Sequence, residues 1–151
     1  MDICQCLHSL RVVLLRGATK AEVIGELIDI VADADIGVSR EDLERAVWKR
    51  EELMSTGLGL GLAMPHARLA DVTRMTMAVG VSRTPIDDYE SFDHDPVRIV
   101  VLIASPEGHH EAYLKLLAQT AAVLKEEHQR QAILEAKDTE EVHLIFTGRR
   151  R

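Results

Sequence analysis

Residues 55–66 of this chain read Ser-Thr-Gly-Leu-Gly-Leu-Gly-Leu-Ala-Met-Pro-His. Glycine takes every second position from Gly57 to Gly61 and permits backbone geometries that a side chain forbids. Pro65 fixes its own backbone angle and biases the preceding residue toward extended conformation. We therefore expect His66 at the end of a strand, held by a stiff backbone as a nucleophile or proton carrier requires.

The glycine spacing excludes two common phosphate-binding motifs. A dinucleotide-binding fingerprint needs a two-residue gap before its third glycine, whereas Gly57, Gly59 and Gly61 strictly alternate. No lysine follows the glycines as it does in a P-loop. The segment instead predicts a smooth backbone that leads directly to His66.

Around this segment the chain alternates between strand and helix patterns. A capping box at Thr19 and Glu22 begins a helix that ends before Gly37, and Ser39 begins a second helix. Further helices are predicted after Gly108, around 133–134 and after the capping-box pattern at 138–141. Strands are predicted at 12–15, 75–81 and 97–103, the last apolar enough to be covered on both faces. These elements predict an α/β (α+β) fold, with a central mixed sheet and helices on both faces.

Arg50 interrupts the apolar face of the second helix. That face is predicted to comprise Leu43, Ala46, Val47, Leu53 and Met54. An arginine on such a face needs an anion or a carbonyl partner, because an unpaired buried charge is very costly. One interpretation is a structural arginine that reaches solvent. The alternative, favoured by the nearby glycine–histidine segment, is an anion-binding role.

Length and charge limit the possible functions. The 151 residues predict one domain over 1–151, with a core at about 7–147 and a basic tail at 148–151. A formal charge of −7 argues against a nucleic-acid partner, which requires clustered Lys and Arg. No apolar run is long enough to span a bilayer, and the start lacks the features of a signal peptide. We therefore expect a cytoplasmic protein without membrane insertion.

Two segments contain weak metal-ligand patterns. Cys4, Cys6 and His8 would share one face of an extended segment, although reduced, partly buried thiols are the simpler interpretation. His94 lies among carboxylates in the acidic connection 85–96, where a solvated loop is the simpler interpretation. We expect no metal site.

Residues 55–66 resemble the phosphorylation-site segment of enzyme IIA components of the sugar phosphotransferase system. The resemblance is to the fructose–mannitol type (EIIA type 2), which includes the nitrogen-regulatory IIA proteins. The family segment reads Ser-Thr-Gly, aliphatic, Gly, any, Gly, aliphatic, Ala, aliphatic, Pro-His, and every position is met. Similarity continues through Arg50-Glu51, Pro96-Val97, 116–118 and 134–138, and so covers almost the whole chain.

The resemblance implies a phosphotransferase/anion-transporter-like fold and a phosphocarrier function. His66 would accept a phosphoryl group from a histidine phosphocarrier protein in a pathway fed by phosphoenolpyruvate. It would pass the group to a IIB component, or use it as a regulatory signal for target proteins. Arg50 would neutralise the phosphoryl oxygens. The candidate supporting residues are Thr56, Gly57, Arg68, His109, His110 and Tyr113. No cofactor is expected, because the carrier delivers the phosphoryl group.

The chain departs from the family pattern at two positions of the site. Ala67 replaces the glycine that usually follows the active histidine, which is tolerable unless a positive φ is needed. Tyr113 stands where the family usually has a second histidine. Either His109 or His110 would replace that imidazole, or Tyr113 would donate a hydrogen bond or simply belong to the core.

Two functions from different classes follow. The first is a cytoplasmic phosphocarrier with a transient phosphohistidine at His66. The second is a non-catalytic regulatory module of the same fold that has lost efficient phosphotransfer, which Tyr113 favours.

Overall fold

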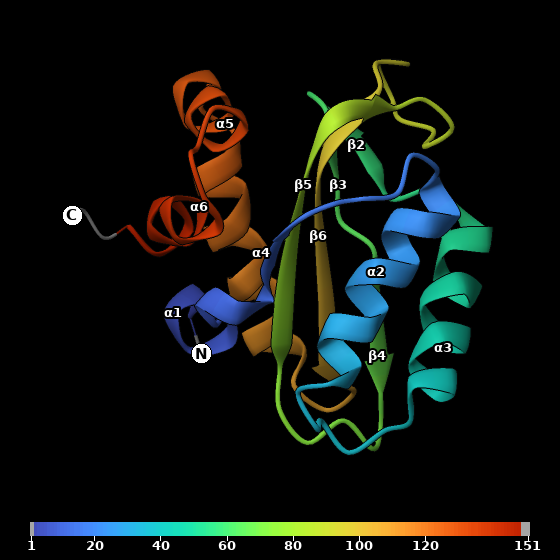
Figure 1. Ribbon diagram of the computed structural model, residues 1–151. Coiled ribbons are helices and arrows are strands. Elements are labelled where there is room, and N and C mark those ends of the chain that lie inside the picture. The colour runs from blue at the N-terminus through green and yellow to red at the C-terminus, as the bar shows by residue number, and fades with distance from the viewer. Residues whose placement is uncertain (1, 149–151) are drawn as a thin grey trace.

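The computed structural model describes residues 2–148, so positions 149–151 of the predicted basic tail lie outside the described residues. It contains a six-stranded mixed sheet between two layers of helices, as the sequence predicts (Figure 1). The first half comprises α1 (Ile3–Cys6), the 3-10 turn η1 (Ser9–Arg11), β1 (Val12–Leu14), α2 (Lys20–Ala32), α3 (Arg40–Leu53), β2 (Gly57–Gly59), β3 (Leu62–Ala63) and β4 (His66–Leu69). The second half comprises β5 (Thr76–Ile86), β6 (Val97–Pro106), α4 (His110–Leu124), α5 (Glu127–Leu134) and α6 (Thr139–Thr147).

The sheet is organised around β6. β5 pairs with β6 in antiparallel orientation, and β1 extends the sheet beyond β5 in parallel. On the other side of β6, first β3 and then β4 pair in parallel along its length, and β2 lies outside β3. His66 is the first residue of β4 and lies opposite Ile103 of β6.

Helices cover both faces of the sheet. α2 and α3 lie on one face, and α4, α5 and α6 lie on the other with α1 (Figure 1). Successive residues of β6 alternate between the two cores: Val101 and Ile103 pack toward α4, and Val100 and Leu102 toward α2. This burial on both faces explains the continuous apolar sequence of β6.

The glycine segment forms a hairpin, so the prediction of a single strand that ends at His66 is wrong. β2 and β3 pair in antiparallel orientation, and His66 begins the next strand. The two turn residues, Leu60 and Gly61, have φ values of 60° and 77°, and Gly59 before them has 90°. Positive φ at both central residues is the requirement of a type I′ hairpin turn.

The alternating glycines also make room for the acidic connection. A Cβ on Gly57 would lie 2.0 Å from the backbone oxygen of Glu90, far inside contact distance. At the turn, the Leu60 amide donates a 2.8 Å hydrogen bond to the Asp93 carboxylate. The connection is therefore packed against the hairpin at Gly57 and at the turn.

The buried face of α3 differs from the predicted one near its C-terminus. Its buried residues are Leu43, Val47 and Glu51, whereas Leu53 and Met54 are 79% and 62% exposed. The helix ends at Leu53, and Met54 has extended backbone with φ −167° and ψ 136°. The predicted stripe fails at its last two positions for different reasons: Leu53 is helical but lies off the buried face of Leu43, Val47 and Glu51, and Met54 lies past the helix end.

The N-terminal segment lacks the geometry that the metal-ligand pattern of Cys4, Cys6 and His8 requires. Cys4 and Cys6 lie on the short helix α1, where Cys4 is exposed and Cys6 is buried. They do not share a face of an extended segment, so that premise is wrong. Within residues 2–148, no three His, Cys, Asp or Glu side chains are grouped as a metal site requires.

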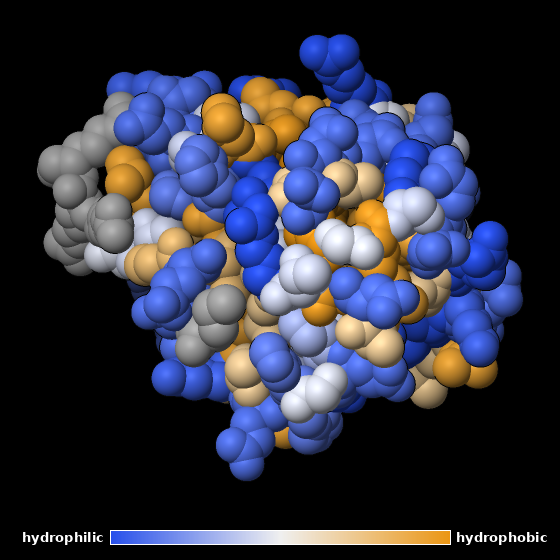
Figure 2. All heavy atoms as spheres, turned by 90° about the horizontal axis from the view of Figure 1, so that it is seen from below, coloured by the Kyte–Doolittle hydropathy of each residue, from blue (hydrophilic) through white to orange (hydrophobic). Residues whose placement is uncertain are grey.

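The outer surface is mixed in character. On the face seen from below, hydrophilic residues predominate, and apolar side chains are visible between them (Figure 2). No helix among the described residues combines the length and the apolarity needed to cross a membrane.

Candidate active site

His66 lies where the two helical layers meet at the edge of the sheet. In β4, Ala67 and Leu69 pack into the core under α2 and α3. Because side chains alternate along a strand, His66 and Arg68 point to the opposite face, toward α4. Both contact Tyr113 in the first turn of that helix. As a residue, His66 is half-buried.

A backbone carbonyl fixes the tautomer of His66. The ring Nδ1 lies 3.1 Å from the carbonyl oxygen of Met64. A carbonyl only accepts hydrogen bonds, so Nδ1 carries the proton and Nε2 keeps its lone pair. Burial lowers the pKa of His66, and the positive charges of Arg50 and Arg68 lower it further. These effects outweigh the Met64 hydrogen bond and the Glu51 charge, which raise the pKa, so the neutral imidazole is favoured.

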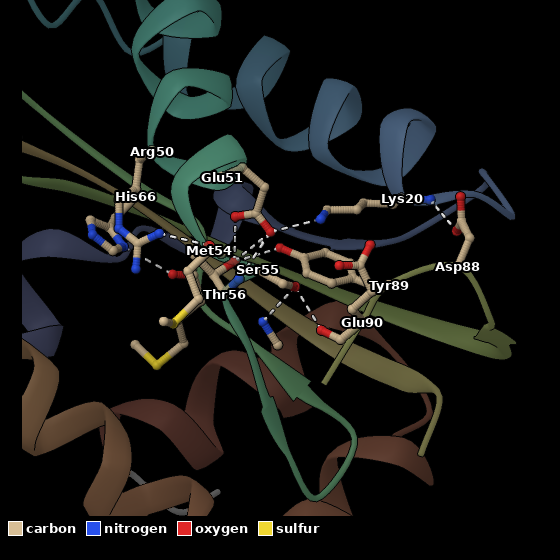
Figure 3. Close-up of polar contacts among 12 residues, drawn as sticks. Lys20, Arg50, Glu51, Met54, Ser55, Thr56, His66, Asp88, Tyr89 and Glu90 are labelled. Carbon is tan, nitrogen blue, oxygen red and sulfur yellow. Dashed lines mark hydrogen bonds and ion pairs between the residues drawn. The ribbon is translucent and has the colours of Figure 1, made fainter. Parts of the chain in front are cut away.

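Arg50 reaches His66 from the last turn of α3. Its side chain is half-buried and lies beside the imidazole (Figure 3). Nη1 donates a 2.7 Å hydrogen bond to the carbonyl oxygen of Met54, one of the free carbonyls at the helix end. This single bond leaves other guanidinium N–H groups for an anion at His66. The sequence prediction that Arg50 and His66 belong together agrees with this arrangement.

Tyr113 and Arg68 form the α4 side of the site. The Tyr113 ring centroid lies 5.7 Å from that of His66, and the planes are inclined by 45°. Arg68 lies over the Tyr113 ring at 5.4 Å and donates a 2.8 Å hydrogen bond to the Glu107 carbonyl. Tyr113 is 6% exposed and also packs in the core. It is thus a core residue, one of the interpretations that the sequence left open, and its ring also contacts His66, while a hydrogen bond from its hydroxyl stays a prediction.

The other candidates lie differently. His109 and His110 are exposed at the start of α4, and the ring that contacts His66 is that of Tyr113. Ala67 is a strand residue without a positive φ, so the change from glycine causes no strain. The Gly57 amide donates a 3.3 Å hydrogen bond to Ser55 Oγ.

Thr56 belongs to a buried network beside the site (Figure 3). Its amide and its hydroxyl donate to the Glu51 carboxylate at 3.0 and 2.7 Å. The Thr56 hydroxyl also lies 2.7 Å from the Tyr89 hydroxyl, and Lys20 Nζ lies 3.1 Å from Glu51. Burial raises the pKa of Tyr89, so its hydroxyl stays protonated. The Thr56 side chain is therefore engaged inside the protein.

Sequence reasoning assigned no role to Glu51, Lys20 or Tyr89. A signal for Glu51 did exist, because it lies four residues after Val47 and eight after Leu43 on the buried stripe. A carboxylate there must find donors in the protein. Nothing in the sequence marks Lys20 or Tyr89, because they reach Glu51 only through the tertiary fold.

Taken together, the site offers a nucleophilic nitrogen faced by fixed positive charge. Nε2 of a neutral imidazole bonds to an electrophilic centre, and guanidinium groups stabilise an anion that forms or arrives beside it. The positive charges of Arg50 on α3 and Arg68 on β4 both act on His66, from different elements. This arrangement suits the transfer of an anionic group to and from the ring.

Comparison with known proteins identifies relatives over nearly the whole chain. The family model "Phosphoenolpyruvate-dependent sugar phosphotransferase system, EIIA 2" matches residues 6–148. The fructose-specific EIIABC component of the phosphotransferase system of Bacillus subtilis is 34% identical over 123 residues. That alignment covers 82% of this chain and 19% of the longer Bacillus protein, so this chain corresponds to only one part of it.

Solved structures show the same fold. The nitrogen regulatory protein IIA-Ntr of Neisseria meningitidis superposes with a TM-score of 0.89 at 28% identity, over 95% of this chain and 98% of that one. The mannitol IIA of Escherichia coli, solved in complex with phosphorylated mannitol IIB, superposes with a TM-score of 0.80 at 20% identity. That match covers 99% of this chain and all of the other.

Proposed function

Because this chain belongs to the EIIA 2 family of the phosphoenolpyruvate-dependent sugar phosphotransferase system, we propose that it carries a phosphoryl group on Nε2 of His66. The donor is a histidine phosphocarrier protein charged from phosphoenolpyruvate. The receiver is a IIB component, or the phosphorylated state itself acts as a signal to regulatory targets. The observation that carries the proposal is the Nδ1–Met64 hydrogen bond, which leaves Nε2 as the nucleophile beside Arg50.

The transfer is a displacement at phosphorus. The Nε2 lone pair of His66 forms the new N–P bond, and the N–P bond of the donor phosphohistidine breaks. Its electron pair returns to the donor imidazole, so no proton needs to leave His66 at this step. Arg50 holds the equatorial phosphoryl oxygens, and Arg68 adds positive charge from the α4 side. The proposed reaction uses no cofactor, and the location that we propose for it is the cytoplasm.

Thr56 and Gly57 support the site in this proposal, and neither contacts the phosphoryl group. The Thr56 hydroxyl is held by Glu51 and Tyr89, and Gly57 makes room for the acidic connection. His109 and His110 are exposed near the site and are available to a docked partner.

Intact-protein mass spectrometry tests the proposal. The protein is incubated with phosphoenolpyruvate, enzyme I and a histidine phosphocarrier, and the wild type is compared with His66→Gln. We expect one phosphoryl mass on the wild type and none on the variant. A phosphoryl gain that persists in folded His66→Gln contradicts the assignment of His66.

Tyr113 supports a second candidate, the non-catalytic regulatory module. A tyrosine beside His66 is unable to become cationic during transfer, unlike a second imidazole. For this candidate, no phosphoryl mass appears with any competent carrier, while partner proteins still bind. Tyr113→His then separates the two functions: a variant that gains phosphorylation shows that Tyr113 blocks the reaction.

A further inference from the structure

Glu51 buries its carboxylate one residue away from Arg50. The side chain is only 2% exposed, and its oxygens accept from the Thr56 amide, the Thr56 hydroxyl and Lys20 Nζ. Burying such a pair requires desolvating both ions, so it contributes little net stability compared with apolar residues of similar volume. A buried pair placed beside the reactive residues therefore calls for a role other than stability.

A continuous series of hydrogen bonds connects this carboxylate to the imidazole. Glu51 fixes the amide and the hydroxyl of Thr56. The carbonyl oxygen of Thr56 accepts from the Met64 amide at 3.0 Å. The carbonyl oxygen of Met64 in turn accepts from His66 Nδ1 at 3.1 Å. Two residues, Thr56 and Met64, thus separate the ion pair from the ring nitrogen that sets the tautomer.

The Glu51 carboxylate also fixes the conformation of the chain where it leaves α3. Arg50 donates to the Met54 carbonyl, which lies two residues before Thr56. Between Glu51 and Thr56 the chain leaves the helix, so the Glu51–Thr56 bonds close a short loop around the Met54 carbonyl (Figure 3). The position of the Arg50 guanidinium therefore depends on the same bonds.

Lys20 secures the network from the first turn of α2. Its Nζ pairs with Glu51 and also lies 4.7 Å from the centroid of the Tyr89 ring. Its backbone amide donates a 2.7 Å hydrogen bond to the Asp88 carboxylate. α2, the acidic connection and the end of α3 thus converge on one carboxylate.

We propose that the Lys20–Glu51 ion pair positions the groups of the active site. It maintains the Nδ1–H tautomer of His66 and the position of the Arg50 guanidinium beside the ring. This inference rests on the proposed function, since it names residues that serve the same transfer. Glu51 and Lys20 touch neither the phosphoryl group nor the reacting nitrogen. They act through Thr56 and Met64. Loss of either charge therefore displaces both the His66 imidazole and the Arg50 guanidinium.

Nitrogen-15 NMR of His66 in the unphosphorylated protein tests this directly. The variants are Lys20→Met and Glu51→Gln, with Lys20→Arg as the conservative replacement that keeps the charge. The matched control is Lys49→Met, the same substitution at an exposed position of α3. We expect the wild type and the control to show the Nδ1–H tautomer at neutral pH. In Lys20→Met and Glu51→Gln, the Nε2–H tautomer becomes detectable, and Lys20→Arg restores the wild-type shifts.

Kinetics with the phosphorylated carrier provide the second measurement. We expect Lys20→Met to lower the transfer rate at saturating donor by at least about tenfold, because misplacement of reacting groups acts on the chemical step. The KM for the donor stays within about twofold of the wild type, because the docking surface is unchanged. Loss of fold would instead remove the cooperative thermal transition.

Wild-type His66 shifts and wild-type rates in folded Lys20→Met overturn the inference. Where Glu51→Gln fails to fold, Lys20→Met alone decides. The two proposals fail separately: a wild type that takes up no phosphoryl group defeats the proposed function. The NMR comparison still decides whether Lys20 and Glu51 position His66.

Discussion

At the scale of single residues, the reactivity of His66 is set by one carbonyl and two cations. The Met64 oxygen selects the Nδ1–H tautomer, and burial together with Arg50 and Arg68 lowers the pKa of the ring. The outcome is a neutral imidazole whose free nitrogen is Nε2. A positive ring would have no lone pair to offer, and repulsion from two guanidinium groups disfavours it.

The pKa of His66 is expected to lie below its ordinary value of about 6.5 and to rise when either neighbouring charge is removed. NMR titration of Arg50→Gln and Arg68→Gln should show this rise, with Arg45→Gln as an exposed control. With the wild type, the initial transfer rate should increase with pH through the His66 pKa and level off by neutrality. An elevated pKa in the wild type, or no change in either variant, would contradict the electrostatic description.

Arg50→Lys is expected to slow phosphorylation by about 10- to 100-fold while leaving the thermal transition unchanged. Lysine keeps the charge but loses the planar fork that binds two oxygens at once. It also lacks the geometry of the Met54 hydrogen bond at the helix end. Arg45→Lys on the exposed side of the same helix is the control. Wild-type kinetics in Arg50→Lys would show that this arginine is purely structural.

At the scale of elements, the glycine hairpin and the acidic connection depend on each other. Gly57 leaves space for the backbone of Glu90, and Asp93 accepts from the turn amide of Leu60. The hairpin includes β3, β3 leads through Pro65 into β4, and β4 begins with His66. A distortion of the hairpin should therefore displace His66, because only a few residues separate the two.

Gly57→Ala is expected to lower the free energy of unfolding by about 1–3 kcal/mol, the usual cost of overpacking. Its Cβ would lie 2.0 Å from the Glu90 oxygen, so the connection has to move. Gly25→Ala in α2 is the matched control, since a Cβ there meets nothing within 4 Å. That substitution should raise stability by up to about 1 kcal/mol through helix propensity. Equal stability of the two variants in urea denaturation would refute the packing argument.

Periodicity and capping predicted most elements because their signals are local. The Thr19 capping box begins α2, and the apolar run of β6 is covered on both faces. The hairpin was missed because alternating Gly and Leu fit an extended strand equally well, and only the positive φ values distinguish a turn. Of the site, His66 and Arg50 were predicted from the motif. The contacts of Lys20 with Glu51 and of Tyr89 with Thr56 depend on tertiary packing and had no local signal.

At the scale of the whole molecule, the site joins the two layers. Arg50 comes from a helix of one layer, Tyr113 from a helix of the other, and His66 from the sheet edge between them. The fold thus brings together groups that are far apart in the sequence.

The formal charge of −7 predicts electrostatic attraction to a carrier with a basic face. We expect kcat/KM for phosphorylation to fall severalfold, by about one order of magnitude at most, as salt rises from low to molar ionic strength. The rate at saturating donor should change little, since screening acts mainly on encounter. A kcat/KM independent of salt would show that charge does not guide this association.

The bonded atom in the phosphorylated protein is expected to be Nε2 of His66. Long-range nitrogen–phosphorus and nitrogen–proton NMR correlations on the phosphorylated protein identify the bonded nitrogen directly. We predict one phosphohistidine, at His66, with phosphorus bonded to Nε2 and a proton retained on Nδ1. Phosphorus on Nδ1 of His66, or on another of the seven histidines, would contradict the account.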